Sequence, residues 1–424
     1  MIDDQWLEAA LAAARPQAMG ALLRYFRDLD AAEEAFQEAC LRALQKWPQD
    51  GPPRNPAAWL IQVGRNAALD HARRQSRNRE LPSEELLSNL EDAEAALAES
   101  LDASHYRDDV LRLLFICCHP DLPAAQQIAL ALRVVSGLSV KEIARAFLVT
   151  ESAMEQRITR AKRRVAAGDV PFETPGADER DSRLSAVCAM IYLLFNEGYS
   201  ASGGELHVRA PLCEDAIRLA RLLLALFPEE AEVRGLTALL ILQHARSKAR
   251  LDERGEIVLL EDQNRALWDL PAIAEGLAMV ASAKNAVPGP YLLQAGIAAE
   301  HARAQRPLET DWGEIDRLYA LLEEAQPSPV VTLNRAVAVS KVRGPAAALV
   351  MIEPLADRLA SYFHYFGTKG AFLLQLGRSD EARAAFDRAI ALANTAAEAA
   401  HIRLQIDRLM SESGRSVRPQ DNGG

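Results

Sequence analysis

A polar, positively charged helix face is predicted near residue 156, in the stretch SGLSVKEIARAFLVTESAMEQRITRAKRRV that begins at Ser136. At helical spacing its apolar residues form two stripes, Val140, Ile143, Ala144 and Phe147, then Met154, Ile158, Ala161 and Val165. Thr150 lies between the stripes, where it can cap the second helix. The outer face of that helix carries Ser152, Gln156, Thr159 and Arg163, flanked by Glu155, Arg160 and Lys162.

Two helices joined by a tight turn, the second with such a face, are typical of a helix-turn-helix, whose second helix enters the major groove of DNA. Gln and Arg make paired hydrogen bonds to base edges, while Lys and Ser hold phosphates. From Arg157 to Arg164 there are five basic residues and no acidic one. The alternative is a solvated basic face on an ordinary helical hairpin.

A second candidate nucleic-acid face is predicted upstream, on the helix PAAWLIQVGRNAALDHARRQSR that begins at Pro56, where proline is favoured. Its inward stripe is Leu60, Val63, Gly64 and Ala67. Its outward side carries Trp59, Gln62, Asn66, Asp70 and Arg73, with Arg65, Arg74 and Arg77 nearby. An aromatic ring, an amide and guanidinium groups suit unpaired bases. The alternative for Trp59 is packing in the core.

Composition predicts a globular, water-soluble chain with no membrane partner. Of 424 residues, 49% are hydrophobic and 25% charged, and the net charge is -11. No segment approaches the about 18 apolar residues of a spanning helix, and MIDDQWLEAALAAARPQ does not have the pattern of a signal peptide. Five cysteines form no disulfide framework, so we expect a reduced, cytoplasmic protein. Cys117, Cys118 and His119 fit a buried helix better than a metal site, and we expect no cofactor.

Changes in composition divide the chain, which we expect to be all-α. Residues 1–79 form one helical domain that ends in a basic run, and 80–109 form an acidic linker with some helix. Residues 110–168 carry the helix-turn-helix, followed by the Pro- and Gly-containing boundary GDVPFETPGADERD. Residues 178–412 are helical hairpins, with GEIVLL at 255–260 as a short strand-like exception, and 413–424 are a disordered tail.

The N-terminal residues resemble the extracytoplasmic-function (ECF) sigma factors of bacterial RNA polymerase. DLDAAEEAFQEACLRALQKW is similar to their region 2 signature at Ala32, Glu33, Gln37, Glu38, Arg42 and Ala43, while Glu34 and Cys40 depart from it. AWLIQVGRNAALDHARR matches the next motif at Trp59, Leu60, Arg65, Asn66, Asp70, Arg73 and Arg74. QRITRAK resembles the end of region 4 and retains Arg157, Arg160 and Ala161. The resemblance covers residues 10–168 and leaves no room for region 3.

The remaining chain resembles the C-terminal extension of one ECF subgroup, which is described as tetratricopeptide-like. Segments such as CAMIYLLFNEGYSAS and SPVVTLNRAVAV carry this resemblance. Gly370, Ala382, Phe386 and Ala389 satisfy the small-residue offsets of that repeat, whereas Asn394 stands where the repeat has proline. Elsewhere the repeat is degenerate, so a helical-hairpin array is the firmer prediction.

The resemblance implies a specificity subunit of core RNA polymerase that binds promoter DNA and is not an enzyme. It assigns polymerase contacts to Gln37, Glu38, Leu41 and Arg42, with Phe36, Cys40 and Leu44 facing the domain core. It assigns the -10 element to Trp59, Gln62, Arg65, Asn66, Arg73 and Arg74, with a flipped base at the loop PQDGPPRNP. It assigns the -35 element to Ser152, Glu155, Gln156, Thr159, Arg160, Lys162 and Arg163. The linker would follow the polymerase's RNA exit path.

Two other functions are compatible with parts of the sequence. A helix-turn-helix regulator with a helical effector domain would leave residues 10–79 without a clear purpose. An enzyme could use His207, His244, His301, Asp311 or Glu197, but no nucleophile and base, phosphate-binding loop or metal pair accompanies them. We expect the C-terminal domain to regulate the sigma part, through a protein partner or an intramolecular contact.

Overall fold

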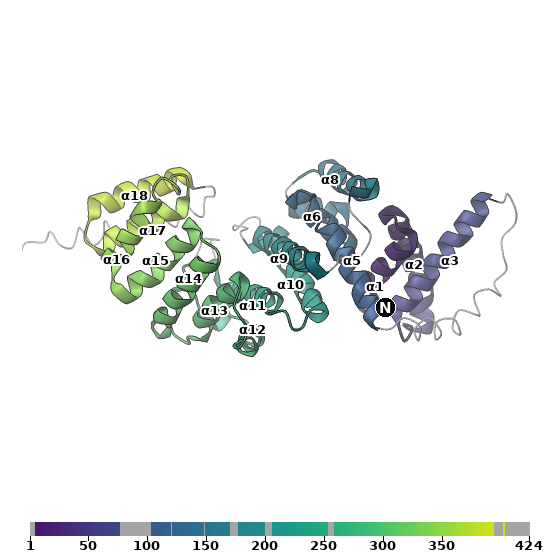
Figure 1. Ribbon diagram of the computed structural model, residues 1–424, viewed down its shortest axis with the longest axis horizontal. Coiled ribbons are helices and arrows are strands. Elements are labelled where there is room, and N and C mark those ends of the chain that lie inside the picture. Colours follow the sequence, from purple (N-terminus) through teal and green to yellow (C-terminus); the bar gives the residue numbers. More distant parts are fainter. Residues whose placement is uncertain are drawn as a thin grey trace, which may run out of the picture. The chain divides into compact units, whose positions relative to one another are not determined.

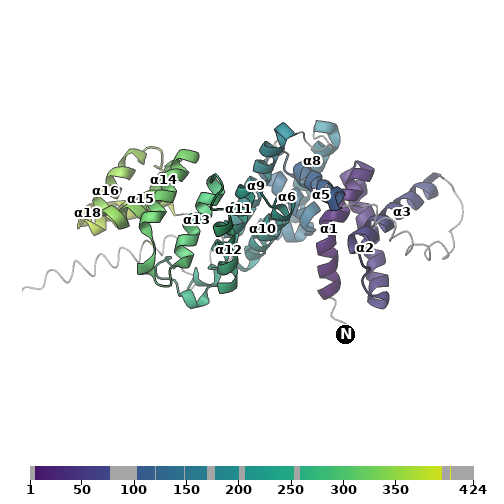
Figure 2. The same cartoon turned by 60° about the horizontal axis from the view of Figure 1, so that its bottom comes forward.

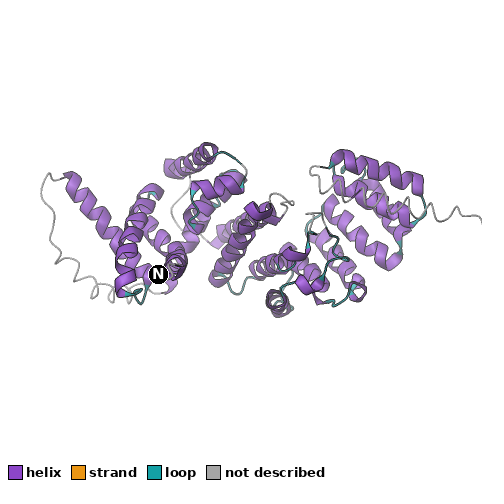
Figure 3. Cartoon of the chain, turned by 180° about the vertical axis from the view of Figure 1, so that it is seen from behind, coloured by secondary structure: helices purple, strands orange, loops and turns teal. Residues whose placement is uncertain are grey.

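The computed structural model describes residues 5–76, 103–119, 121–147, 149–169, 177–199, 206–252, 258–393 and 402, and these ranges contain helices and no strand (Figures 1 and 3). The predicted all-α fold is therefore confirmed. The chain divides into two compact units. Unit 1 comprises 1–197 with 214–219, and unit 2 comprises 198–213 with 220–424. None of the described helices is both long and apolar enough to cross a membrane.

Unit 1 begins with three helices that pack against one another, α1 (Gln5–Phe26), α2 (Leu29–Asp50) and α3 (Pro56–Ser76). Asp28 caps α2 by accepting from Ala31 N at 2.8 Å, and Asn55 caps α3 by accepting from Ala58 N at 3.1 Å. The predicted inward stripe of α3 is confirmed, because Leu60, Val63, Gly64 and Ala67 are all buried. These caps and apolar faces fix α3 against α2.

One side of α2 differs from the prediction. Phe36 is buried and Cys40 partly buried, but Leu44 is 50% exposed, so its assignment to the core was wrong. The buried face instead continues through Ala39, Ala43 and Trp47, three or four residues apart. The stripe thus rotates around the helix, which the spacing of Phe36, Cys40 and Leu44 alone did not reveal.

The helix-turn-helix lies in the second part of unit 1. Its elements are α5 (Ala103–Cys117), α6 (Ala124–Ala131), the π-helical turn η2 (Leu132–Ser136), α7 (Val140–Ala146), α8 (Glu151–Arg164) and the π-helical turn η3 (Val165–Asp169). Ser139 and Glu142 form a capping box on α7. Thr150 caps α8 as predicted, accepting from Ala153 N at 3.2 Å, and the second apolar stripe is buried throughout.

The boundaries predicted from composition fall partly inside helices. Residues 103–109 of the predicted acidic linker form the start of α5, and residues 80–102 lie outside the described ranges, as does the predicted tail. Helix α9 (Ala177–Tyr199) begins inside the predicted boundary and belongs to unit 1 as far as Glu197. Burial, and then the neighbouring Cys117 and Cys188 thiols, raise the pKa of the Cys118 thiol, so α9 packs near the end of α5.

Unit 2 is a succession of helices, most of them joined by short connections, with a longer segment between His244 and Leu270 (Figures 1 and 2). Helix α10 (Leu206–Leu226) begins in unit 2 and includes residues 214–219 of unit 1. The helices that follow it are α11 (Ala231–His244), α12 (Leu270–Ser282), α13 (Pro290–Arg303), α14 (Trp312–Ala325), α15 (Pro329–Arg343), α16 (Pro345–Ile352), α17 (Phe363–Gln375) and α18 (Ser379–Leu392). From α13 to α18 each helix contacts the next. Three-residue 3-10 turns lie at 247–249, 265–267, 307–309 and 353–355.

The last hairpin, α17 and α18, explains the small residues of the predicted repeat. Ala382, Phe386 and Ala389 have no exposed surface. A Cβ atom on Gly370 would lie 2.5 Å from Cε1 of Phe386, so only glycine allows the ring to pack there. Asn394 and the first half of GEIVLL, residues 255–257, lie outside the described residues, and 258–260 are not a strand.

Candidate nucleic-acid interface

The outer face of α8 is exposed as predicted, with one exception. Ser152, Glu155, Gln156, Arg160 and Arg163 are exposed and Thr159 is partly exposed. The Lys162 side chain, in contrast, is only 16% exposed and donates to Asp30 Oδ1 at 2.6 Å and to Glu33 Oε2. Placing Lys162 on the outer face was therefore wrong in this structure, where its ammonium contacts α2.

The predicted -10 residues on α3 differ in exposure: Gln62, Arg65 and Asn66 are at least partly exposed, whereas Trp59 is buried. Asn66 is exposed and Gln62 partly exposed, and the Arg65 guanidinium lies 4.4 Å from the centre of the Tyr25 ring. Arg73 and Arg74 lie on α3, but their side chains are outside the described residues. The resulting face carries two amides and a guanidinium.

Trp59 does not share that face. It is 8% exposed and packs edge to face against Trp47, with the ring centres 5.3 Å apart. Placing Trp59 on the outward side was therefore wrong. The indole is the largest apolar group on α3, and burying it against Trp47 removes more apolar surface from water than an outward position would.

The predicted polymerase contacts lie along the outside of α2. Gln37 is exposed, Leu41 is 56% exposed, and Arg42 Nε donates to Glu38 Oε1 at 3.2 Å. Leu44, one turn beyond Leu41, adds a second exposed leucine. Two exposed leucines beside polar groups form a small apolar patch with a polar border.

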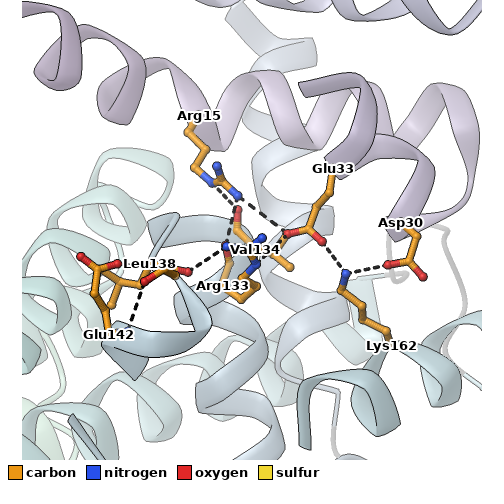
Figure 4. Close-up of polar contacts among 9 residues, drawn as sticks. Arg15, Asp30, Glu33, Arg133, Val134, Leu138, Glu142 and Lys162 are labelled. Carbon is orange, nitrogen blue, oxygen red and sulfur yellow. Dashed lines mark hydrogen bonds and ion pairs between the residues drawn. The ribbon is translucent and has the colours of Figure 1, made fainter. Parts of the chain in front are cut away.

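A buried ionic cluster joins α2 to the helix-turn-helix, and the sequence analysis missed it (Figure 4). Glu33 is 5% exposed. Its Oε2 accepts from Lys162, and its Oε1 lies 3.4 Å from Arg133 Nε and 3.9 Å from Arg15 Nη2. The sequence analysis named Glu33 only as a residue that matches the region 2 signature. No local pattern connects it with Arg133 or Lys162, which lie about 100 or more positions further along the chain.

The electrostatics of this cluster are those of a partly dehydrated ionic site. Burial lowers the pKa of Lys162, but hydrogen bonds and charges from Asp30 and Glu33 outweigh burial and raise it above the ordinary value. Burial also lowers the pKa of Arg15, where Glu33 opposes the effect and Arg133 adds to it. The Lys162 ammonium is therefore charged near neutral pH.

Unit 2 contains a cavity of about 740 Å³. Its lining includes the aromatic side chains of Trp312, Tyr319, Phe363 and Phe372 and the basic side chains of Arg265 and Lys341. His301 lies edge to face against Trp312, and burial, with Arg246 and Arg265 nearby, lowers the pKa of His301 to about 4. Its imidazole is therefore neutral near pH 7, and the site suits a ligand with apolar surface.

Three family profiles match consecutive parts of the chain. Residues 11–78 match sigma-70 region 2, residues 112–165 match sigma-70 region 4, and residues 183–284 match a family of unknown function, DUF6596. A probable ECF RNA polymerase sigma factor, SigI, of Mycobacterium tuberculosis (strain CDC 1551 / Oshkosh) is 26% identical over 175 residues, which cover 41% of this chain and 59% of SigI. The chain is an ECF-type sigma-70 protein with a C-terminal extension.

The extension is shared by a full-length relative. An uncharacterized protein of Rhizobium meliloti (strain 1021) is 66% identical over 413 residues, which cover 97% of this chain and 98% of the relative. In the sigma-70 protein described here, region 2 covers most of α1 together with α2 and α3, and region 4 covers the end of α5 together with α6–α8. Sigma factors are initiation factors rather than enzymes. Asp311, considered for catalysis, instead caps α14 by accepting from Glu314 N at 2.9 Å.

We predict that Trp59→Ala lowers the free energy of unfolding by about 3–5 kcal/mol, because it leaves a cavity beside Trp47. Asn66→Ala, at an exposed position of the same helix, should melt like the wild type. Thermal unfolding followed by circular dichroism measures both. A Trp59→Ala protein with unchanged stability but defective promoter opening would instead show that the indole contacts DNA.

Proposed function

We propose that the chain binds core RNA polymerase and directs promoter-specific initiation, reading the -35 element with α8 and opening the -10 element with α3. The observation that carries this proposal is the presence, in one chain, of both sigma-70 regions, with an exposed polar and basic face on α8. The experiment that tests it is run-off transcription by the purified chain with core polymerase.

The -35 assignment rests on what α8 offers a major groove. Gln156 and Arg163 can make paired hydrogen bonds to base edges, and Arg160 can hold a phosphate. Ser139 caps the N-terminus of α7 and Thr150 caps the N-terminus of α8. Both helices therefore begin at a fixed residue, and the exposed face lies on well-formed helices. The net charge of -11 disfavours nonspecific binding of DNA to the rest of the molecule.

The -10 assignment rests on α3 and the loop before it. Flipping a base out of the duplex costs a few kcal/mol, which contacts to the base must offset. Asn66 and Gln62 offer amides for hydrogen bonds, and the loop 51–55 that precedes the helix offers backbone groups. Trp59 takes part indirectly in this proposal, since its packing against Trp47 ties the start of α3 to the end of α2.

Polymerase binding is proposed for the outer side of α2. The exposed leucines Leu41 and Leu44 would be buried by a partner helix, and Gln37, Glu38 and Arg42 would form the polar rim. A helix-turn-helix regulator that does not bind polymerase is the second candidate. Failure to associate with core polymerase would favour it.

We further propose that unit 2 modulates the sigma part by binding a partner. Its cavity combines aromatic walls with basic side chains and a neutral histidine, which are features of a recognition site. The partner is a protein or another part of this chain, and the modulation is either inhibition or assistance.

We predict that Leu41→Asp weakens association with core polymerase by about 5- to 30-fold, because it introduces a charge where an apolar contact forms. Leu41 is 56% exposed, so the fold should be unaffected. Leu270→Asp is the matched control, since Leu270 is 68% exposed and lies in unit 2. Affinity measured by fluorescence anisotropy with labelled core polymerase separates the two. Equal affinities of the two variants would contradict the proposed contact.

We predict that Gln156→Ala relaxes specificity at one position of the -35 element by about 1–3 kcal/mol, the loss of a paired contact to a base. Arg160→Ala should instead weaken binding to all sequences alike and reduce the salt dependence, as expected for a phosphate contact. Binding of the holoenzyme to a panel of -35 variants measures both effects. Uniform weakening by Gln156→Ala would remove it from base recognition.

We predict that a chain ending after residue 229 binds core polymerase like the full chain but differs in run-off yield. This end point keeps α9 and the α10 residues that belong to unit 1. A higher yield identifies unit 2 as an inhibitor and a lower yield as an assistant, while identical yields contradict modulation. A chain ending after residue 176 is the control for stability, because it loses α9 and should melt at a lower temperature.

A further inference from the structure

We propose that the cavity of unit 2 is a binding site for a small organic anion, a molecule with a flat apolar or aromatic body and one carboxylate-like group. The inference goes beyond the proposed function, because such a site would bind its ligand whether or not the chain binds polymerase. It rests on the position of the cavity between the helices, on the aromatic side chains that line it and on the charges of its wall.

The cavity lies where two hydrophobic clusters of unit 2 meet. Phe363 and Phe372 belong to the cluster built mainly by α15–α18, whereas Ile315 belongs to the cluster built by α13–α15. Helix α15 takes part in both clusters and contacts both α14 and α17 (Figure 1). Protein interiors rarely contain voids much larger than a water molecule. A cavity of about 740 Å³ is therefore no packing defect, and its volume is typical of sites for small molecules.

The aromatic side chains that line the cavity are not all covered by the protein. Trp312 and Tyr319 of α14 are partly exposed, and His364 of α17 is exposed. Apolar ring surface left in contact with water gains free energy when a ligand covers it. Because aromatic rings offer flat faces, these side chains favour a ligand with a flat apolar body.

A lysine lies beside these rings. The Lys341 ammonium is 5.7 Å from the centre of the Trp312 ring and 3.0 Å from Glu261 Oε2, and all three residues line the cavity. This ion pair is open to solvent, since 38% of the Lys341 side chain and 52% of the Glu261 side chain are exposed. Such pairs contribute little to stability. A ligand carboxylate can therefore replace Glu261 at Lys341 at little cost.

Arg265 supplies a second positive charge to the wall of the cavity. Its Nη1 donates to the His301 carbonyl at 3.0 Å, and its guanidinium lies 4.4 Å from the centre of the Trp268 ring. Among the described residues its Nε has no hydrogen-bond partner. Burial, and then the neighbouring Arg246, lower the pKa of Arg265, and Glu309 opposes this only in part. The positive charge is therefore incompletely balanced, which favours an anion nearby.

The charges of the wall favour an anion over a cation. Among the described lining residues, Lys341 and Arg265 are basic and Glu261 is the single carboxylate. Two positive charges and one negative charge leave the wall with a formal charge of +1, with histidines counted as neutral. The chain as a whole has a net charge of -11. A local charge of the opposite sign attracts anionic ligands to this part of the molecule.

The small ligand and the proposed partner of unit 2 would use different parts of this region. Leu308 belongs to the lining but is 98% exposed, and it lies in the three-residue turn at 307–309. It therefore lies at the mouth of the cavity, where a protein surface can cover it. The interior, with Trp312 and the buried Phe372, suits a ligand that is small enough to enter.

Fluorescence titration with anilinonaphthalene sulfonate tests the site, because this probe combines an aromatic body with one anionic group and emits strongly in apolar surroundings. We expect saturable binding to the full-length chain. Naphthoate should displace the probe at about tenfold lower concentration than the uncharged naphthamide, since a charge-assisted hydrogen bond to Lys341 is roughly twice as strong as a neutral one. Acetate, which has no ring, should not displace the probe at the same concentrations.

Two variants locate the ligand in the cavity by different means. Lys341→Gln removes the charge beside Trp312, and we expect it to weaken naphthoate binding by about 5- to 10-fold and to leave naphthamide binding unchanged. Ala371→Trp adds a large side chain to the α17 part of the lining and should weaken both by about tenfold or more. Lys284→Gln is the matched control, since Lys284 is exposed, lies in unit 2 and is not among the described lining residues.

The outcomes keep this site distinct from the proposed function. Naphthoate affinity that Lys341→Gln leaves unchanged would overturn the anion site, and this variant decides even where Ala371→Trp does not fold, because the Lys341 side chain is 38% exposed. Absence of saturable probe binding would also overturn the site and would leave the cavity to the proposed partner. Equal displacement by naphthoate and naphthamide would contradict selection of an anion. Since the titration needs no polymerase, failure of the sigma function would leave these results unaffected.

Discussion

The buried Glu33 carboxylate is the constraint on which the arrangement of unit 1 depends. A carboxylate that is 5% exposed is tolerated only when cations lie around it, and here they come from α1, η2 and α8. Each of these elements is thereby fixed relative to α2. The apolar stripes of the helices determine which faces are buried, but several ways of stacking such faces are comparable in energy. A charge that needs specific partners distinguishes among them.

Local structure was predictable from the sequence because its causes are local. The caps at Thr150 and the stripe from Met154 to Val165 follow from residue types a few positions apart, and both were confirmed. Three placements failed for one common reason. Trp59 and Lys162 were placed by helical spacing and Leu44 by the family resemblance, but their environments are determined by the burial face of the whole helix or by another helix, which neither contains.

Domain limits were less predictable than helices because they depend on packing and not on composition. The Pro- and Gly-containing segment 168–181 resembles a boundary, yet α9, which begins inside it, belongs to unit 1 as far as Glu197. Apolar residues of α9 such as Val187, Ile191 and Leu194 are buried. Proline and glycine indicate where a helix ends, whereas a domain ends where the residues no longer contribute to its hydrophobic core. The repeat offsets around Gly370 succeeded because they encode a packing contact directly, that of glycine with the Phe386 ring.

The ion pairs of Lys162 with Asp30 and Glu33 also bear on the -35 face proposed for α8. An ammonium that binds two carboxylates cannot bind a phosphate at the same time. In this arrangement the cations that α8 exposes therefore include Arg160 and Arg163 but not Lys162.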